Sequence, residues 1–215
     1  MAGKRKVHAS VKDEGLVKLR REQMVKGAIN LFKEKGFHRT TTREIASASG
    51  FSIGTLYEYI RSKEDVLYLV CDQIYEEVHE KISETMQDLH QVTKETVKNG
   101  IAAYFRIMDE MQDELLVMYQ EAKSLSKEAL PYVLEKELQM VSMFEKLILQ
   151  YVENNQWEID VRQVKLLAHN IVVLGQMWGF RRWALRKLYT IEEYTKLQTD
   201  IFLNSILQFS IAKTS

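Results

Sequence analysis

Hydrophobic residues recur along most of the chain at helical spacing, and the first such run defines a helix near the N-terminus. Between Leu19 and Phe32 the apolar positions follow i, i+3, i+4 and i+7 spacing, which places them on one helical face. Gly36 ends the run, since glycine readily takes the left-handed conformation that terminates helices. Glycine is otherwise scarce, and Pro131 is the single proline. Because sheet proteins need many tight turns rich in these residues, the sequence predicts an all-α fold.

Capping residues mark the starts of the next three helices. Thr41 and Glu44 have the spacing of a capping box, which opens a very short helix. Ser52 caps a second short helix over residues 53–60. A further capping box over residues 62–65 opens a long helix that runs to about residue 86. The pattern therefore predicts three compact helices followed by a connector helix, with a short helix, a glycine-containing turn and a second short helix in the order of a helix-turn-helix.

The C-terminal two-thirds of the chain also reads as helix throughout. Pro131 falls in the first turn of one predicted helix, where proline is tolerated, and Asp160 offers an N-cap for the next. The last two helices have apolar residues on more than one face, so they need partners on two sides. Apolar residues at helical spacing predict helices near residues 93–110, 112–123, 127–155, 160–188 and 191–212.

Charge is distributed unevenly although the chain as a whole is neutral. Residues 1–65 hold fourteen basic and eight acidic residues, a net charge of +6, and the remainder carries −6. A basic end on an acidic body favours a polyanionic partner for the first part, the alternative being a solvated charged surface. Cys71 is the only cysteine, which excludes an internal disulfide and fits a reducing cytoplasm. No apolar stretch reaches the length of a membrane span, and residues 4–6 are not followed by the apolar run of a signal peptide.

The helix-turn-helix region resembles a known family closely. The DNA-binding signature of TetR-type regulators is similar to three runs of this chain: GFHRTTTREIA at residues 36–46, SGFSIGTLYEYI at 49–60 and SKE at 62–64. The resemblance covers roughly residues 18–70. Phe51 and Ile60 depart mildly from the family pattern but stay apolar. Basic residues with little apolar content predict a flexible tail over residues 1–17, which either lies along DNA or stays solvated. The resemblance implies a helix-turn-helix DNA-binding domain over 18–65 and a larger helical ligand-binding and dimerisation domain over 66–215.

Residues of the paired helices are the candidate DNA contacts. The leading turn of the second helix is slim and includes a glycine, which suits a close approach to base edges. The resemblance implies contacts by an arginine of the first helix and by two tyrosines and a lysine further on; the alternative for each tyrosine is packing inside the small domain. The predicted DNA-binding residues are Thr41, Thr42, Arg43, Ser52, Ile53, Gly54, Thr55, Tyr57, Tyr59 and Lys63.

The C-terminal domain contains residues suited to a small effector. Methionine and aromatic side chains adapt to a flexible lipid-like ligand, and an arginine pair between two tryptophans can hold an acidic head group. The alternatives are ordinary core packing for the apolar residues and internal or inter-subunit ion pairs for the arginines. The predicted ligand-binding residues are Tyr104, Met108, Tyr119, Met140, Met143, Phe144, Trp178, Arg181 and Arg182.

These features predict a cytoplasmic repressor that binds palindromic operator DNA as a homodimer. A two-fold four-helix interface, as the family uses, would cover the doubly apolar C-terminal helices. A long-chain acyl-coenzyme A or fatty acid is the predicted effector, and the alternative is a lipophilic cation sensed by a multidrug-type repressor. Neither a phosphate-cradling glycine loop, an HExxH motif nor a cysteine pair is present, so no enzyme, cofactor or metal is expected.

Overall fold

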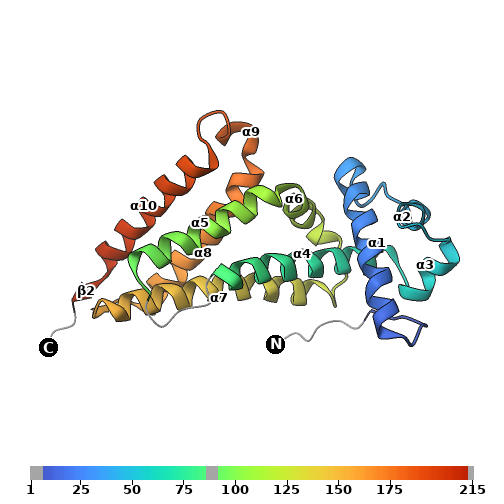
Figure 1. The fold of residues 1–215 in the computed structure, drawn as a ribbon, viewed down its shortest axis with the longest axis horizontal. Coiled ribbons are helices and arrows are strands. Elements are labelled where there is room, and N and C mark those ends of the chain that lie inside the picture. Colours follow the sequence, from blue (N-terminus) through green and yellow to red (C-terminus); the bar gives the residue numbers. More distant parts are fainter. Residues whose placement is uncertain (1–6, 86–91, 213–215) are drawn as a thin grey trace. The chain divides into compact units, whose positions relative to one another are not determined.

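The computed structural model describes residues 7–85 and 92–212, and its regular structure is almost entirely helical (Figure 1). The predicted all-α class is therefore confirmed. The exception is a short antiparallel pairing of two strands, β1 and β2. The elements are α1 (Glu14–Lys35), α2 (Thr42–Ala48), α3 (Ile53–Tyr59), α4 (Lys63–Thr85), α5 (Lys94–Glu110), α6 (Gln112–Glu121), η1 (Ala122–Ser124), α7 (Leu130–Asn154), β1 (Trp157–Glu158), α8 (Val161–Phe180), α9 (Arg182–Leu185), α10 (Ile191–Phe209) and β2 (Ile211–Ala212).

The chain divides into two compact units that do not follow the sequence order. The first unit falls within residues 1–76 and 113–136, and the second within 77–112 and 137–215. The helices α4 and α7 each begin in the first unit and end in the second. The helix-turn-helix thus groups with most of α6 and with the start of α7, whereas the sequence pattern sets a domain boundary at residue 65.

The three N-terminal helices begin and end where local hydrogen bonds are available. The carboxylate of Asp13 accepts from the Leu16 amide at 3.0 Å, so α1 starts at Glu14, four residues before the predicted domain start. Gly36 ends α1 with a φ of 79°, a backbone conformation in which a residue with a side chain would be strained. Gly27 lets α1 approach α2 closely, since a Cβ there would lie 3.1 Å from the backbone of Ala48.

The first unit has an apolar core that extends from the helix-turn-helix into α4, α6 and α7. Met24, Ile45 and Leu56, from α1, α2 and α3, have no exposed surface. Elsewhere in this core the Tyr132 hydroxyl of α7 donates to the buried Asp72 carboxylate of α4 at 2.7 Å, which joins the two helices. Burial and that carboxylate both raise the pKa of Tyr132, so the phenol stays protonated as the donor.

The second unit packs α5 against α8 and α10, which lie side by side (Figure 1). The Tyr104 hydroxyl donates to the Val172 carbonyl at 3.0 Å, and its ring meets Phe144 edge-on with centroids 5.2 Å apart. The helix predicted over residues 160–188 is wrong in one respect, because it breaks at Arg181 and continues only as the short α9.

Two other boundaries in the second unit bear on the prediction. Asp160 caps α8 in a capping box with Gln163, as its sequence position predicts. The final helix stops at Phe209 rather than at residue 212. Its last predicted residues instead form β2, in which Ile211 pairs with Glu158 and Ala212 with Trp157. A strand pairing between two segments so far apart in the chain leaves no mark in helical spacing.

Candidate DNA-binding site

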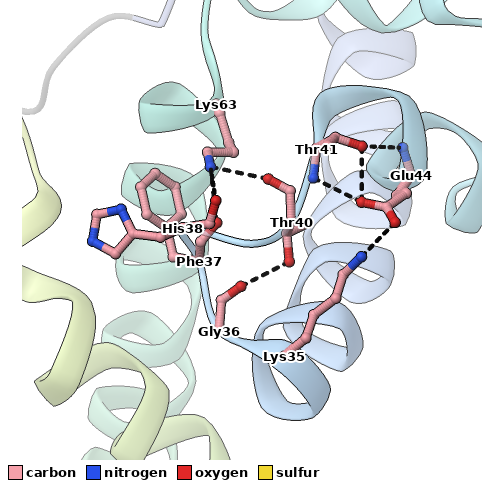
Figure 2. Close-up of polar contacts among 8 residues, drawn as sticks. All are labelled: Lys35, Gly36, Phe37, His38, Thr40, Thr41, Glu44 and Lys63. Carbon is pink, nitrogen blue, oxygen red and sulfur yellow. Dashed lines mark hydrogen bonds and ion pairs between the residues drawn. The ribbon is translucent and has the colours of Figure 1, made fainter.

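Local caps hold both helices of the helix-turn-helix in place. The Thr41 hydroxyl accepts from the Glu44 amide at 3.3 Å, while the Glu44 carboxylate accepts from the Thr41 amide at 2.9 Å (Figure 2). Ser52 accepts from the Thr55 amide at 3.0 Å and starts α3. Between them Gly50 turns the chain with a φ of 73°. Both predicted caps are confirmed, so the start of each helix is set within four residues of sequence.

An ion pair strengthens the cap of α2. The Lys35 ammonium, at the end of α1, reaches the Glu44 carboxylate, as Figure 2 shows. The hydrogen bonds from Lys35 and then from Thr41 lower the pKa of Glu44 from 4.5 to about 2. The same carboxylate therefore caps α2 and ties it to α1.

Lys63 supports a loop rather than lying free at the helix start. Its ammonium donates to the carbonyls of Phe37 at 2.8 Å, of Thr40 at 2.9 Å and of His38 at 3.3 Å (Figure 2). It also lies 4.2 Å from the centroid of the Phe37 ring, which it attracts as a cation. The DNA contact predicted for Lys63 stays a prediction: a phosphate contact would have to displace bonds that hold residues 37–40.

The leading turn of α3 is open to solvent, as a DNA-reading helix requires. Ser52, Ile53 and Gly54 are exposed, and Thr55 is half-buried. Tyr57 is 48% exposed and follows on the same side of the helix. Arg43 of α2 is also exposed, whereas Thr42 is half-buried. The structure thus brings seven of the ten predicted contacts, Thr42, Arg43, Ser52, Ile53, Gly54, Thr55 and Tyr57, to the accessible surface of α2 and α3.

Two other predicted contacts have internal roles. Tyr59 is only 3% exposed, so its ring packs in the core and the packing alternative holds for this tyrosine. It lies three residues after Leu56 and one before Ile60, both fully or almost fully buried, and helical spacing carries it to the inner face. Thr41 is exposed but its hydroxyl is engaged in the capping box.

The predicted effector residues are dispersed. Tyr119, on α6 of the first unit, is 63% exposed and cannot join a buried lining; the neighbouring Met118 occupies the inner face instead. Met143 is half-buried. The others of the apolar set pack as core of the second unit, each at most 2% exposed: Tyr104, Met108, Met140, Phe144 and Trp178.

The arginine pair beside the tryptophans is not arranged as an anion clamp. Arg181 stacks over the Trp183 ring at 5.8 Å, and Arg182 donates to the Gln112 side chain at 3.3 Å. The Asp109 carboxylate accepts from the Trp178 indole at 2.7 Å and ion-pairs with a third arginine of this segment, Arg186, at 2.6 Å. A carboxylate at this position disfavours an acidic ligand.

These features define a helix-turn-helix DNA-binding protein, with two capped short helices presenting an open reading face. Residues 25–68 match the family model described as "Bacterial regulatory proteins, tetR family". The solved structure of a bacterial regulatory protein in the tetR family, from Rhodococcus RHA1, aligns with a TM-score of 0.71 and 21% identity, over 90% of this chain and 98% of its own. The helix-turn-helix region of this chain therefore matches the DNA-binding domain of TetR-family regulators.

Two relatives and one solved structure extend the likeness to most of the chain. The HTH-type transcriptional regulator HbdR of Aromatoleum sp. (strain CIB) is 28% identical, over 99% of this chain and 93% of its own length. The HTH-type transcriptional repressor KstR2 of Mycobacterium tuberculosis is 24% identical over 68% and 74% of the two chains. The structure of AibR in complex with isovaleryl coenzyme A and operator DNA aligns with a TM-score of 0.67 and 16% identity, over 85% and 97%. These likenesses cover both units.

Residues 7–85 and 92–212 contain no group of three histidine, cysteine or acidic side chains placed to hold a metal ion. In the same ranges, no helix combines the length and the apolar character that crossing a membrane requires.

Proposed function

We propose that this protein is a ligand-responsive transcriptional repressor that binds palindromic operator DNA as a homodimer. The observation that carries the proposal is the open leading turn of α3 on a rigidly capped helix-turn-helix. A helix held by Ser52 and by the packing of Leu56 can enter a major groove without refolding. The relative KstR2 is named a transcriptional repressor, which supports repression rather than activation.

Exposed apolar residues on α8 and α10 support the dimer. Leu166 and Val173 on α8 are 56% and 57% exposed, and Leu197 and Ile201 on α10 are 48% and 61% exposed. Each pair is spaced by seven or four residues, so each forms a stripe along one side of its helix. Such a stripe is costly in water, and a second copy related by two-fold symmetry would cover it.

Selection of binding sites from random duplexes tests this function. The expected product is a palindrome protected by one or more dimers, with half-sites on one side of the duplex. Electrophoretic shifts on the selected site and on a scrambled site of equal composition then measure discrimination. A footprint without sequence preference would contradict the proposal and favour a DNA-packaging protein.

The effector proposed is an amphipathic acid, with a long-chain acyl-coenzyme A as first candidate. AibR, bound to isovaleryl coenzyme A, offers support by analogy of fold. In this chain a groove of about 300 Å³ between α5 and α10 offers cationic side chains, among them Arg106. It also includes Thr199, whose buried hydroxyl is without a hydrogen-bond partner among the described residues. The groove is lined by Lys98, Asn99, Ala102, Arg106, Ile191, Glu192, Thr195, Lys196, Thr199 and Asp200.

The charges of this groove favour an anion only moderately. Lys196 lies 3.0 Å from Asp200, and Lys98 lies 3.6 Å from Glu95, so two of its cations already have partners. Arg106 is exposed, and a guanidinium suits carboxylates and phosphates. An acidic group placed between Arg106 and Thr199 would gain a charged donor and satisfy a buried hydroxyl.

Calorimetric titration distinguishes the effector classes. Palmitoyl-coenzyme A, free palmitate and a lipophilic cation are titrated into the full chain, and each is then tested for release of the selected operator. We expect the acids to bind and to release DNA, because an effector must favour the DNA-incompetent state. Arg106→Gln should weaken the acid, with Arg162→Gln, an exposed arginine on α8, as control. Tight binding of the cation alone would contradict the acidic effector.

A further inference from the structure

The C-terminal end of the reading helix α3 is capped by residues far away in sequence. A helix leaves its last carbonyls without partners inside the helix, and α3 has only seven residues. Its C-cap residue, Ile60, is extended rather than left-handed. The Ser10 amide donates to the Glu58 carbonyl at 2.8 Å, and the Ser10 hydroxyl donates to the same oxygen at 3.2 Å. The segment before α1 therefore supplies the missing partner.

Arg21 joins the same segment to the same helix end. One guanidinium nitrogen, Nη2, donates to the carbonyls of Val7 at 2.7 Å, His8 at 3.2 Å and Tyr59 at 3.2 Å. Val7 is 5% exposed, so a buried side chain anchors the segment, while His8 and Ser10 are exposed. One side chain of α1 thus bonds the chain before the helix-turn-helix and the last turn of the reading helix at once.

We propose that residues 7–10 and Arg21 form a strap that positions α3 for sequence reading. The strap holds the end of α3 opposite to the exposed turn at Ser52–Thr55, so movement there would tilt the reading residues against the base edges. The inference rests on the proposed operator binding. It makes Arg21 a positioning residue, which acts through Tyr59 and the strap.

The shape of the Arg21 side chain distinguishes it from a lysine at the same position. Burial lowers the pKa of Arg21 while the nearby Asp65 carboxylate raises it, and the guanidinium remains charged at neutral pH. A planar guanidinium presents its donors in a fixed geometry, so Nη2 is held where it reaches three carbonyls from two chain segments. A lysine would keep the charge, but its flexible stem lacks the planar guanidinium that fixes the position of Nη2.

Four forms of the full chain test the strap on the operator selected above: the wild type, Arg21→Lys, a deletion of residues 2–10, and the triple variant Lys4→Ala, Arg5→Ala, Lys6→Ala. The triple variant removes the basic residues ahead of the strap and leaves residues 7–10 in place. Fluorescence anisotropy measures the affinity for operator and for scrambled DNA over a range of salt. Thermal unfolding shows that each form is folded.

Arg21→Lys and the deletion are expected to lose about tenfold in operator affinity, the equivalent of one or two hydrogen bonds to bases. Affinity of Arg21→Lys for scrambled DNA and its salt slope should stay within about twofold of the wild type, since no phosphate contact is removed. Amide hydrogen exchange over residues 56–60 should be faster in both forms than in the triple variant.

Three outcomes would overturn the strap. Unchanged operator affinity in both forms, with a wild type that discriminates, would contradict the strap and leave operator binding intact as a function. Equal losses on operator and scrambled DNA in Arg21→Lys would mean that the residue only stabilises the fold. If the triple variant loses as much affinity as the deletion, the loss comes from the basic charges and not from the strap. Failure of the wild type to discriminate would instead contradict the proposed function itself.

Discussion

The hydroxyl of Thr42, in the first turn of α2, lies 3.2 Å from the hydroxyl of Tyr57 in α3. This contact joins the two short helices on their solvent side, because Tyr57 is 48% exposed and Thr42 is half-buried. Either oxygen can be the donor, so the Tyr57 proton is free to turn towards a phosphate when DNA binds. The phenol is held in place before DNA arrives, and little ordering remains to be done on binding.

Tyr57→Phe is therefore expected to weaken DNA binding of any sequence by about tenfold, through loss of one hydrogen bond to a charged group. Folding should be unchanged because the hydroxyl is on the surface. Electrophoretic shifts on the selected operator and a scrambled site provide the measurement.

Ile53→Val and Thr55→Ser are the comparison for Tyr57→Phe, since both residues lie in the leading turn of α3. They should change the preferred bases while leaving binding to scrambled DNA unchanged. Equal losses on both DNAs for all three variants would place the reading surface elsewhere.

The pKa of Glu44 predicts how the helix-turn-helix responds to acid. Its folded-state value is lowered from 4.5 to about 2 by Lys35 and Thr41. A lowered carboxyl pKa adds stability that is present above pH 4.5 and is lost as pH falls towards 2. The difference in unfolding free energy between wild type and Glu44→Gln should therefore shrink between pH 5 and pH 3. Chemical denaturation at a series of pH values measures it, with Glu34→Gln, an exposed glutamate of α1, as control.

The apolar stripe on α10 gives a test of the dimer with an internal contrast. Ile201 is 61% exposed whereas Ile206 is completely buried in its own chain. Ile201→Asp should give a folded monomer, because it places a charge in the proposed interface. Ile206→Asp should instead prevent folding, since it buries a charge without a partner. Light scattering with circular dichroism separates the two results, and a folded Ile201→Asp dimer would move the interface away from α10.

The parts of the site that could be predicted are those set by local chemistry. The caps by Thr41, Ser52 and Asp160 all appear where the sequence places them, because each needs only a polar side chain two or three residues before a free amide. The helical spacing of Leu56, Tyr59 and Ile60 also contained the signal that Tyr59 faces inwards, although the family pattern suggested a DNA contact.

The parts that could not be predicted depend on contacts between distant residues. Lys63 bonds carbonyls that lie 23 to 26 residues earlier, and the donors of Arg21 reach backward to Val7 and forward to Tyr59. A backbone carbonyl has no sequence signature, so neither role is visible in the residues alone. The same holds for Asp109, whose contacts with Trp178 and Arg186 span about seventy residues. Its carboxylate disfavours an anion beside these two residues.

Two glycines of α8 test whether the methionine and aromatic residues are a core or a cavity. A Cβ on Gly175 would overlap the Tyr104 ring and lie 3.1 Å from Met108 Cγ, whereas one on Gly179 would be no closer than 3.6 Å to Gln112. The Tyr104 ring is held by Val172 and Phe144 and has little room to retreat.

Gly175→Ala should therefore lower stability by about 1–3 kcal/mol through overpacking. Gly179→Ala should be neutral or raise stability by up to about 1 kcal/mol, since alanine favours helix without a clash. Thermal unfolding without ligand compares the stabilities of the two variants. Both are glycine-to-alanine changes on α8, four residues apart. If Gly175→Ala is as stable as Gly179→Ala, Tyr104 has space to move. In that case the interior beside α5 and α8, rather than the groove at Arg106, becomes the place to look for the acyl chain of the effector.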